Sequence, residues 1–358
     1  MKNKISSSIV IMIVAFFVIS FLFGCGAKND KEIVINLDEI KDISTEKFTD
    51  LKIADNKGDT IYFGRIADII LGNDSDIIIV DSKKSRLVQL DKNGNFKKYV
   101  GRQGFGPGEF NFPEKGVYYN DNYYIRDNNG QLIQKYDKDM NYLTSYKTNS
   151  NDIAFINESE IVSIYEESDK YIFCTRDTLG NIIRSFGDIE GNEEGLIKNK
   201  MRIEVKCVYD SIYKHIFLVS VGAPIIRRFD LNGNLLQRIN IEGAIIDSVR
   251  AKEKQPPGIV QIVDKDGNLV TPDLSRVTYF RTYLASASSA EGHRLIIFIQ
   301  NFGAIVLHYN DNDIIDQKII KCEIETEDKS VIPSALKDFN NIMLLYEGFY
   351  GKLFISKN

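Results

Sequence analysis

One pattern recurs along most of this chain and constrains its fold more than any other feature. Two apolar-rich segments are separated by a short turn that opens with Asp or Asn, as in "LDKNG" and "FDLNG". Each copy alternates apolar and polar residues with a period near two, and the helical period of 3.6 is absent, which predicts short antiparallel strands joined by hairpins. The copies, of which 170–187 is weaker and 341–358 lacks its final strand, span 76–101, 122–146, 170–187, 215–241, 294–320 and 341–358.

The spacing of these copies indicates a closed array of blades. The turn aspartates Asp91, Asp137, Asp177 and Asp230 are separated by 46, 40 and 53 residues. A period of about 40–50 residues with four short strands is typical of a β-propeller blade, and stacking blades around an axis buries faces that one blade would expose. We therefore predict an all-β fold, a six-bladed β-propeller of four-stranded antiparallel blades. The predicted blades span roughly 70–115, 116–150, 151–195, 203–250, 258–325 and 330–358.

The sixth blade is short by one strand, and the N-terminal part of the chain offers a replacement. The segment "EIVINLDEI" (32–40) has a strand pattern. We expect N- and C-terminal strands to share one blade and close the ring, so that no edge is left frayed. The predicted propeller domain is 32–358.

A glycine-rich stretch, "GRQGFGPGEFNFP" (101–113), follows the first copy. Gly104, Gly106 and Gly108 allow backbone angles that other residues avoid, Pro107 fixes the turn, and Glu109 is placed to accept hydrogen bonds from turn amides or to pair with an arginine. A phosphate-binding loop would need G-x-G-x-x-G or GxxxxGK[ST] between a strand and a helix, and neither pattern is present. The stretch therefore predicts a structural turn, with Phe110 and Phe112 packing between blades.

The residues 80–113, "VDSKKSRLVQLDKNGNFKKYVGRQGFGPGEFNFP", resemble the NHL repeat with its GPGEF turn. The chain looks most like the six-bladed propeller lipoproteins of bacteria. The resemblance is specific at 76–140, whereas the later blades rest on the strand pattern alone. It implies a scaffold that does not by itself fix an activity.

The N-terminus is predicted to be an export signal. Lys2 and Lys4 precede fifteen apolar residues, Ile9 to Phe23 with one serine, which is short for a membrane-spanning helix and suited to a signal peptide. The following "LFGC" resembles the bacterial lipobox. That resemblance implies a signal peptide at 1–24, a diacylglycerol (palmitate-type) anchor on Cys25 and a lipidated tether at 25–31. An uncleaved anchor with an incidental cysteine is the alternative.

Residues that carry chemistry are sparse. No G-x-S-x-G or H-E-x-x-H motif occurs, and His215, His293 and His308 are scattered, so we predict no catalytic residues, no metal site and no cofactor. The remaining cysteines lie in strand-like runs and read as core or half-buried residues, and a disulfide between two of them stays open. These cysteines are Cys174, Cys207 and Cys322.

One of two apparent insertions, 253–292, is a candidate interaction surface, the other being 190–204. Its aromatic and arginine residues are of the types enriched at interface cores; an ordinary strand of the fifth blade is the alternative. The residues of this candidate surface are Arg276, Tyr279, Phe280, Arg281 and Tyr283.

The net charge of −5 and the pI near 5.5 argue against a nucleic-acid partner. We expect an exported lipoprotein, anchored to the cell envelope at the outer membrane or cell surface, whose propeller binds an envelope protein, peptide or glycan without catalysis. The alternatives are a metal-dependent propeller hydrolase or lyase with its site in the central channel, and a purely structural envelope component.

Overall fold

A computed structural model provides the structure of this chain. The unit Glu32–Asn358 is compact. The residues described are 31–358 without 73–75, 128–130, 148–152, 158–159, 165–170, 178, 180, 189–204, 211, 221–223, 248–261, 264–268, 271–283, 291–293, 300–301, 327–334, 339–341, 348–351 and 358.

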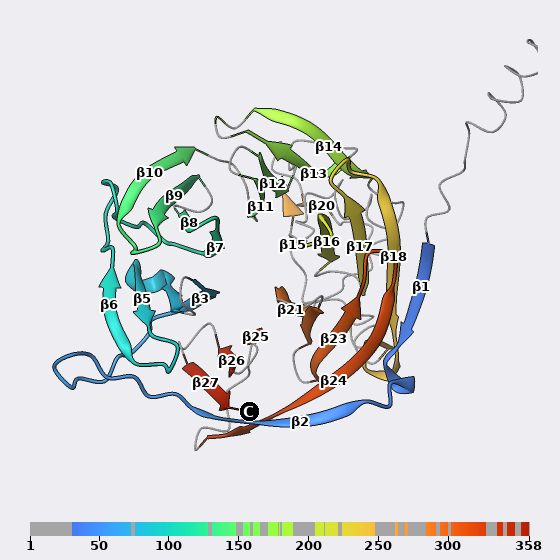
Figure 1. The fold of residues 1–358 in the computed structure, drawn as a ribbon, viewed down its shortest axis with the longest axis horizontal. Helices are drawn as coiled ribbons and strands as arrows, with labels where there is room; N and C mark the ends of the chain where they lie inside the picture. Colours follow the sequence, from blue (N-terminus) through green and yellow to red (C-terminus); the bar gives the residue numbers. More distant parts are fainter. Residues whose placement is uncertain are drawn as a thin grey trace, which may run out of the picture. The chain divides into compact units, whose positions relative to one another are not determined.

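Within that unit, antiparallel groups of strands follow one another around a common centre (Figure 1). The first three groups are sheets of four strands each, joined in the order of the chain. Their first residues, 66, 115 and 153, lie within four residues of the predicted blade starts at 70, 116 and 151, whereas the first group ends at 100, well before the predicted end at 115. Their strands are β3 (Ile66–Leu71), β4 (Ile77–Asp81), β5 (Arg86–Leu90) and β6 (Phe96–Val100); β7 (Lys115–Tyr119), β8 (Asn122–Asp127), β9 (Leu132–Asp137) and β10 (Tyr142–Lys147); and β11 (Ile153–Asn157), β12 (Glu160–Ile164), β13 (Tyr171–Arg176) and β14 (Ile182–Asp188).

The next three groups complete the ring, with a small separate hairpin, β19 (Ile262–Val263) and β20 (Leu269–Val270), between two of them. The sixth group contributes three strands from the C-terminal end of the chain. The strands of these groups are β15 (Val205–Asp210), β16 (His215–Ser220), β17 (Ile225–Asp230) and β18 (Leu235–Glu242); β21 (Leu284–Ala290), β22 (Arg294–Ile299), β23 (Gly303–Tyr309) and β24 (Ile314–Glu325); and β25 (Ala335–Asp338), β26 (Ile342–Glu347) and β27 (Lys352–Lys357).

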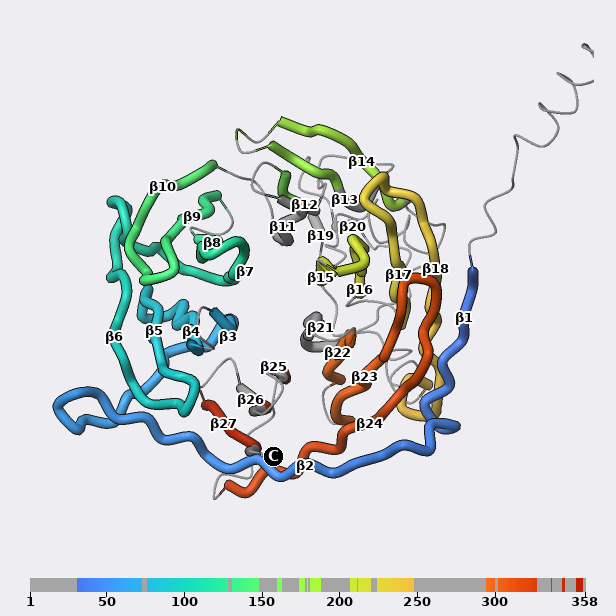
Figure 2. Tube along the Cα trace, viewed as in Figure 1, coloured from blue at the N-terminus to red at the C-terminus, as the bar shows by residue number. Residues whose placement is uncertain are grey.

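The N-terminal strands pass along the outside of three blades (Figure 2). β1 (Lys31–Asn36) lies beside β18, and after the 3₁₀ turn η1 (Leu37–Glu39) the strand β2 (Ile43–Asp50) pairs in parallel with β24. The end of β2 then pairs antiparallel with β27. The closure of one blade by N- and C-terminal strands is therefore confirmed.

The prediction that residues 32–40 form this closing strand is wrong. The strand that reaches β27 is 43–50, which pairs with β24 along most of its length and with β27 at Thr49 and Asp50. The first half of 32–40 is β1, which extends the fourth blade. Leu37 and Ile40, from its second half, are buried in a cluster formed by the fourth and fifth blades. These apolar side chains hold the segment away from β27, because they fill the space between two other blades.

The hydrophobic core is divided among the boundaries between blades. Each of six buried clusters joins side chains of two neighbouring groups of strands. The cluster of Leu344 and Leu353 with Ile69 and Ile79, for example, joins the last blade to the first. A period-two strand buries both of its faces only when a blade is present on each side, so this packing links the repeat pattern to a closed ring.

Most of the recurring turns share one hydrogen-bond pattern between the third and fourth strands. In the first blade, Asp91 Oδ1 accepts the amides of Asn93 and Asn95 at 2.8 Å, and its Oδ2 accepts the Asn95 side chain at 2.9 Å. Asp137, Asp177 and Asp230 accept equivalent bonds in the next three blades. These local bonds explain why similar turn residues recur at the same place in these four copies.

Candidate interaction surface

The connections around β3 and β7 lie on one edge of the first two blades. In an antiparallel sheet the second and fourth strands end at the same edge, and the first strand begins there. The loop 51–65 that enters β3, the 3₁₀ turn η3 (Ser82–Lys84) and the loop 101–114 between β6 and β7 therefore share this edge. We call it the loop face.

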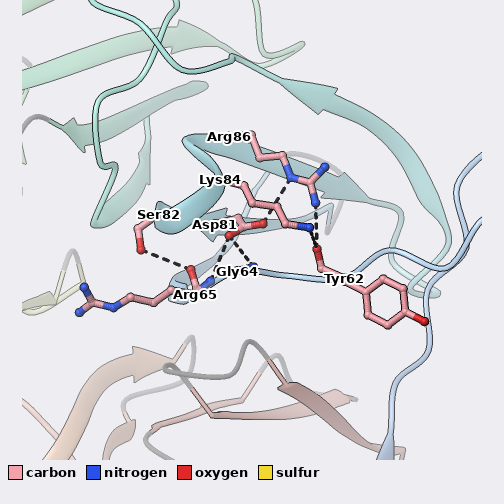
Figure 3. A network of polar contacts seen from close by, with 7 residues as sticks. All are labelled: Tyr62, Gly64, Arg65, Asp81, Ser82, Lys84 and Arg86. Carbon is pink, nitrogen blue, oxygen red and sulfur yellow. Dashed lines mark hydrogen bonds and ion pairs between the residues drawn. The ribbon is translucent and has the colours of Figure 1, made fainter.

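A buried carboxylate fixes the loop that enters β3 (Figure 3). Asp81, at the end of β4, is fully buried. One of its oxygens accepts the amides of Gly64 at 2.9 Å and Arg65 at 3.2 Å, and the other lies 3.3 Å from Arg86 Nε. Ser82 adds a backbone bond of 2.9 Å to the Arg65 carbonyl. The end of one strand thereby sets the path of a loop about 17 residues earlier in the chain.

Two cations hold the same loop at Tyr62, just before Gly64. The carbonyl oxygen of Tyr62 accepts hydrogen bonds from Lys84 Nζ and from Arg86 Nη2. The Arg86 guanidinium also lies 4.3 Å from the centre of the Tyr99 ring, so its position is fixed from several sides. The Tyr62 ring points away from this network, as Figure 3 shows, and the residue is 72% exposed.

The glycine-rich stretch between β6 and β7 is an ordered turn centred on Glu109. The Glu109 carboxylate accepts the amide of Gly106 at 3.0 Å and pairs with Arg102 at 2.7 Å. The Gly106 amide, and after it the Arg102 side chain, hold the pKa of Glu109 below its ordinary value. Phe110 exchanges backbone bonds with Arg102 and Gly104 at 2.8 and 3.0 Å, which closes the loop on itself.

The glycines of this turn serve two different purposes, which corrects the single explanation drawn from the sequence. Gly108 has a φ of +74°, as expected. Gly104 and Gly106 have no positive φ. A Cβ on Gly104 would lie 2.0 Å from Oε2 of Glu109, and one on Gly106 would lie 3.1 Å from it. These two glycines therefore make room for the carboxylate.

The second blade repeats the clamp of the first. Asp127, at the end of β8, accepts the amide of Asn111 at 3.0 Å and the side chain of Gln134 at 3.1 Å. Gln134 also donates to the Glu109 carbonyl at 2.6 Å. Phe110 is fully buried between the first two blades, 5.9 Å from the Tyr136 ring. The loop is thus held at its centre and at its end.

Aromatic and cationic side chains project from these fixed loops. Phe105, at the tip of the glycine-rich turn, is 80% exposed, and the Arg102 side chain is 82% exposed. The two loops meet where the Arg65 guanidinium lies 5.4 Å from the centre of the Phe112 ring. We call this set the loop-face patch. It consists of the half-buried Arg65 and of exposed residues, which are Tyr62, Lys83, Lys84, Arg102 and Phe105.

The interaction residues predicted from the sequence, Arg276 to Tyr283, lie outside the described residues, and so does the predicted lipidation site Cys25. The turn residues Gly104 to Glu109 are described and contribute to the loop face. Tyr62 and Lys84 were missed. The available signal was the pair of basic residues Lys83 and Lys84, one residue beyond the buried strand "IIIVD".

Three cysteines and one histidine that the sequence also singles out lie in the described part of the chain. Cys174 and Cys207 are buried, Cys322 is half-buried, and none of the three takes part in a disulfide. His215 begins β16, and its Nδ1 accepts a hydrogen bond of 3.1 Å from the buried Arg228. Burial, and then the charge of Arg228, lower the pKa of His215.

In the part of the chain that the structure describes, no group of three or more His, Cys, Asp or Glu is arranged to hold a metal ion. Among the same residues, no helix has the length and apolar character needed to cross a membrane.

Comparison with known proteins adds a family and a fold. A family model described as a six-bladed β-propeller, DUF5128, matches residues 25–222. No curated protein matches the chain.

Three solved structures similar to this chain are at most 12% identical to it, so these likenesses concern the fold alone. A Bacteroides fragilis protein named as exported is 12% identical, with a TM-score of 0.54 over 88% of this chain and 99% of that one. A gluconolactonase of Xanthomonas campestris is 10% identical, with a TM-score of 0.48 over 83% and 86%. A Bacteroides thetaiotaomicron protein of unknown function is 11% identical, with a TM-score of 0.47 over 88% and 75%.

Proposed function

This chain belongs to the DUF5128 family of six-bladed β-propellers, and we propose that it is an exported, lipid-anchored protein of the bacterial cell envelope whose propeller binds a partner molecule without catalysis. The partner is a protein, a peptide or a glycan of the envelope. The loop-face patch is the surface that we assign to this binding.

The proposed binding role rests on one observation: buried carboxylates hold the backbone of the exposed loops in place. Asp81 and Asp127 are buried at the ends of equivalent strands, and each accepts backbone amides of the loop that enters its own blade. Aromatic and arginine side chains on fixed supports are the usual centres of binding energy, because little conformational entropy is lost when they are buried. Tyr62 and Phe105 are such side chains, with 72% and 80% exposure in this chain alone.

Export and anchoring are supported by the N-terminal sequence. A basic start, an apolar run and "LFGC" precede the first described strand by a few residues. Cys25 would carry the diacylglycerol. A thioether-linked diacylglycerol carries two acyl chains, which are enough for stable membrane attachment.

The anchor is tested by labelling cells with a radioactive fatty acid. The wild-type protein should incorporate label and be shortened, whereas Cys25→Ala should remain an unlabelled precursor. A Cys25→Ala protein that is still processed and still labelled would contradict the lipobox assignment.

Binding is tested by using soluble residues 26–358 as bait against detergent-solubilised envelope of the source organism, with and without chelator. A saturable partner should be retained by the wild type and lost from Tyr62→Ala/Phe105→Ala. Ile315→Ala, which removes another exposed apolar side chain, is the matched control, since Ile315 lies on the outer strand β24. Absence of any partner, together with a stoichiometric metal in the bait, would favour the propeller hydrolase or lyase instead.

A further inference from the structure

We infer that the partner of the loop-face patch is an acidic protein segment, one that places an apolar pocket over Phe105 and carboxylates beside the surrounding lysines and arginines. This inference rests on the proposed binding function and specifies its ligand. Three observations support it: the charges of the patch, the chemistry of its exposed aromatic residue Phe105, and the contacts that join the two loops.

The charges of the patch are opposite in sign to the charge of the chain. The whole sequence carries −5, yet the charged members of the patch are all cations; Arg102 is paired with Glu109 of the same turn, so the positive excess comes from Arg65, Lys83 and Lys84. Lys83 and Lys84 are exposed and follow the buried Asp81 and Ser82. A locally positive surface on an acidic protein attracts acidic partners and speeds their association.

The carboxylates near the patch are already engaged by groups of the protein itself. Asp81 and Asp127 are buried and accept loop amides. Glu109 pairs with Arg102, and Glu114 lies 2.6 Å from Arg126. Asp59 is exposed in the middle of the loop 51–65, in a turn where its backbone amide donates to the Asp55 carboxylate, and it is the exposed carboxylate nearest in sequence to Tyr62. Little negative charge is therefore left at the patch to oppose an acidic ligand.

The identity of the most exposed aromatic residue favours a protein over a polysaccharide. Phe105 is 80% exposed and has no polar atom on its ring, so its burial gains free energy only against an apolar pocket. Folded proteins provide such pockets, and a rim of acidic residues would complete the match with the lysines. A neutral sugar chain could stack on the Phe105 ring, but its hydroxyl groups would give the lysines no opposite charge.

The patch is continuous from one loop to the other. Lys83 packs beside Gly64, where an added Cβ would lie 2.9 Å from the Lys83 Cβ, and Lys84 donates to the Tyr62 carbonyl. Arg65 lies over Phe112 of the neighbouring loop. One ligand segment can therefore contact the lysines and the glycine-rich turn together.

The experiment measures binding of immobilised soluble protein, residues 26–358, to three polymers: poly(Glu,Tyr), poly-L-lysine and polygalacturonate. We expect saturable binding of poly(Glu,Tyr), weakening as salt is raised because the charged groups are solvent-exposed. Lys83→Ser/Lys84→Ser and Phe105→Ala should each weaken it by about tenfold, which is a typical effect for a central interface residue. Poly-L-lysine should not bind.

The control variant is Lys92→Ser/Lys138→Ser, which removes two exposed lysines from the Asp91 and Asp137 turns at the opposite edge of the same blades. It should bind poly(Glu,Tyr) like the wild type. Equal loss in the control, tighter binding of polygalacturonate or no binding of poly(Glu,Tyr) would overturn the inference. If the envelope extract still yields a saturable partner that is lost from Tyr62→Ala/Phe105→Ala, the binding function stands and only its acidic-protein ligand is refuted.

Discussion

Removal of the Asp81 carboxylate tests whether the loop face is held by the clamps described above. Asp81→Ala deletes the acceptor of two loop amides and the partner of Arg86 in a fully buried position. Hydrogen bonds to a charged group contribute about 1.5–3 kcal/mol each, and they are not additive. Loss of one member of a buried ion pair costs about 3–5 kcal/mol. We therefore expect a loss of about 3–5 kcal/mol in the free energy of unfolding.

The assay is thermal unfolding of the soluble domain followed by circular dichroism. At about 2 °C per kcal/mol for a large domain, the melting temperature of Asp81→Ala should fall by about 6–10 °C. Asp91→Ala is the matched control, because Asp91 also accepts two backbone amides but does so in a surface turn, so its loss should cost about 1 kcal/mol.

A double variant separates the ion pair from the backbone bonds. Arg86→Met in the Asp81→Ala background removes the cation left without its carboxylate, so it should cost less than it does alone. Equal melting temperatures for Asp81→Ala and Asp91→Ala would refute the idea that burial makes the first carboxylate more important.

Three further perturbations probe other parts of the ring. Gly104→Ala should lower stability by about 1–3 kcal/mol in denaturant titrations, because its Cβ would overlap the Glu109 carboxylate; a neutral effect would contradict the spatial role of this glycine. Phe48→Ala should cost about 3–5 kcal/mol, because Phe48 is fully buried where β2 joins the last two blades; unchanged unfolding would show that β2 contributes little to closure. His215 has a lowered pKa, so its contribution should be present above its unfolded pKa of about 6.5 and lost as pH falls below that value. Unfolding measured from neutral to mildly acidic pH should show a smaller acid-dependent loss in His215→Gln than in the wild type, and identical profiles would exclude this contribution.

Some features of this fold could be read from neighbouring residues alone. The turn at Asp91 is specified locally, since its side chain bonds amides two and four residues later. The period-two strands and their spacing likewise fix the blade as a unit, because both depend on short stretches of sequence. The glycine-rich turn was recognised for the same reason, although the space needed by Glu109 was not.

Other features depended on contacts that sequence spacing does not encode. Both 32–40 and 43–50 contain a strand, and backbone hydrogen bonding alone does not decide which of them pairs with β27. Only the burial of Leu37 and Ile40 between the fourth and fifth blades decides which one does. Pairing in a sheet uses backbone groups that are the same in every strand, so the choice of partner comes from side-chain packing.

The sequence by itself determined the all-β repeat, the hairpin turns and the predicted export signal, because each of these is written in contiguous residues. The tertiary structure decided where the N-terminal strands lie and which loops form a surface. In the sequence Tyr62 is one of 18 tyrosines, and it is distinguished only when Asp81, Lys84 and Arg86 are brought to its loop by the fold. A site assembled in this way exists only when the folded backbone brings together residues that are distant in sequence.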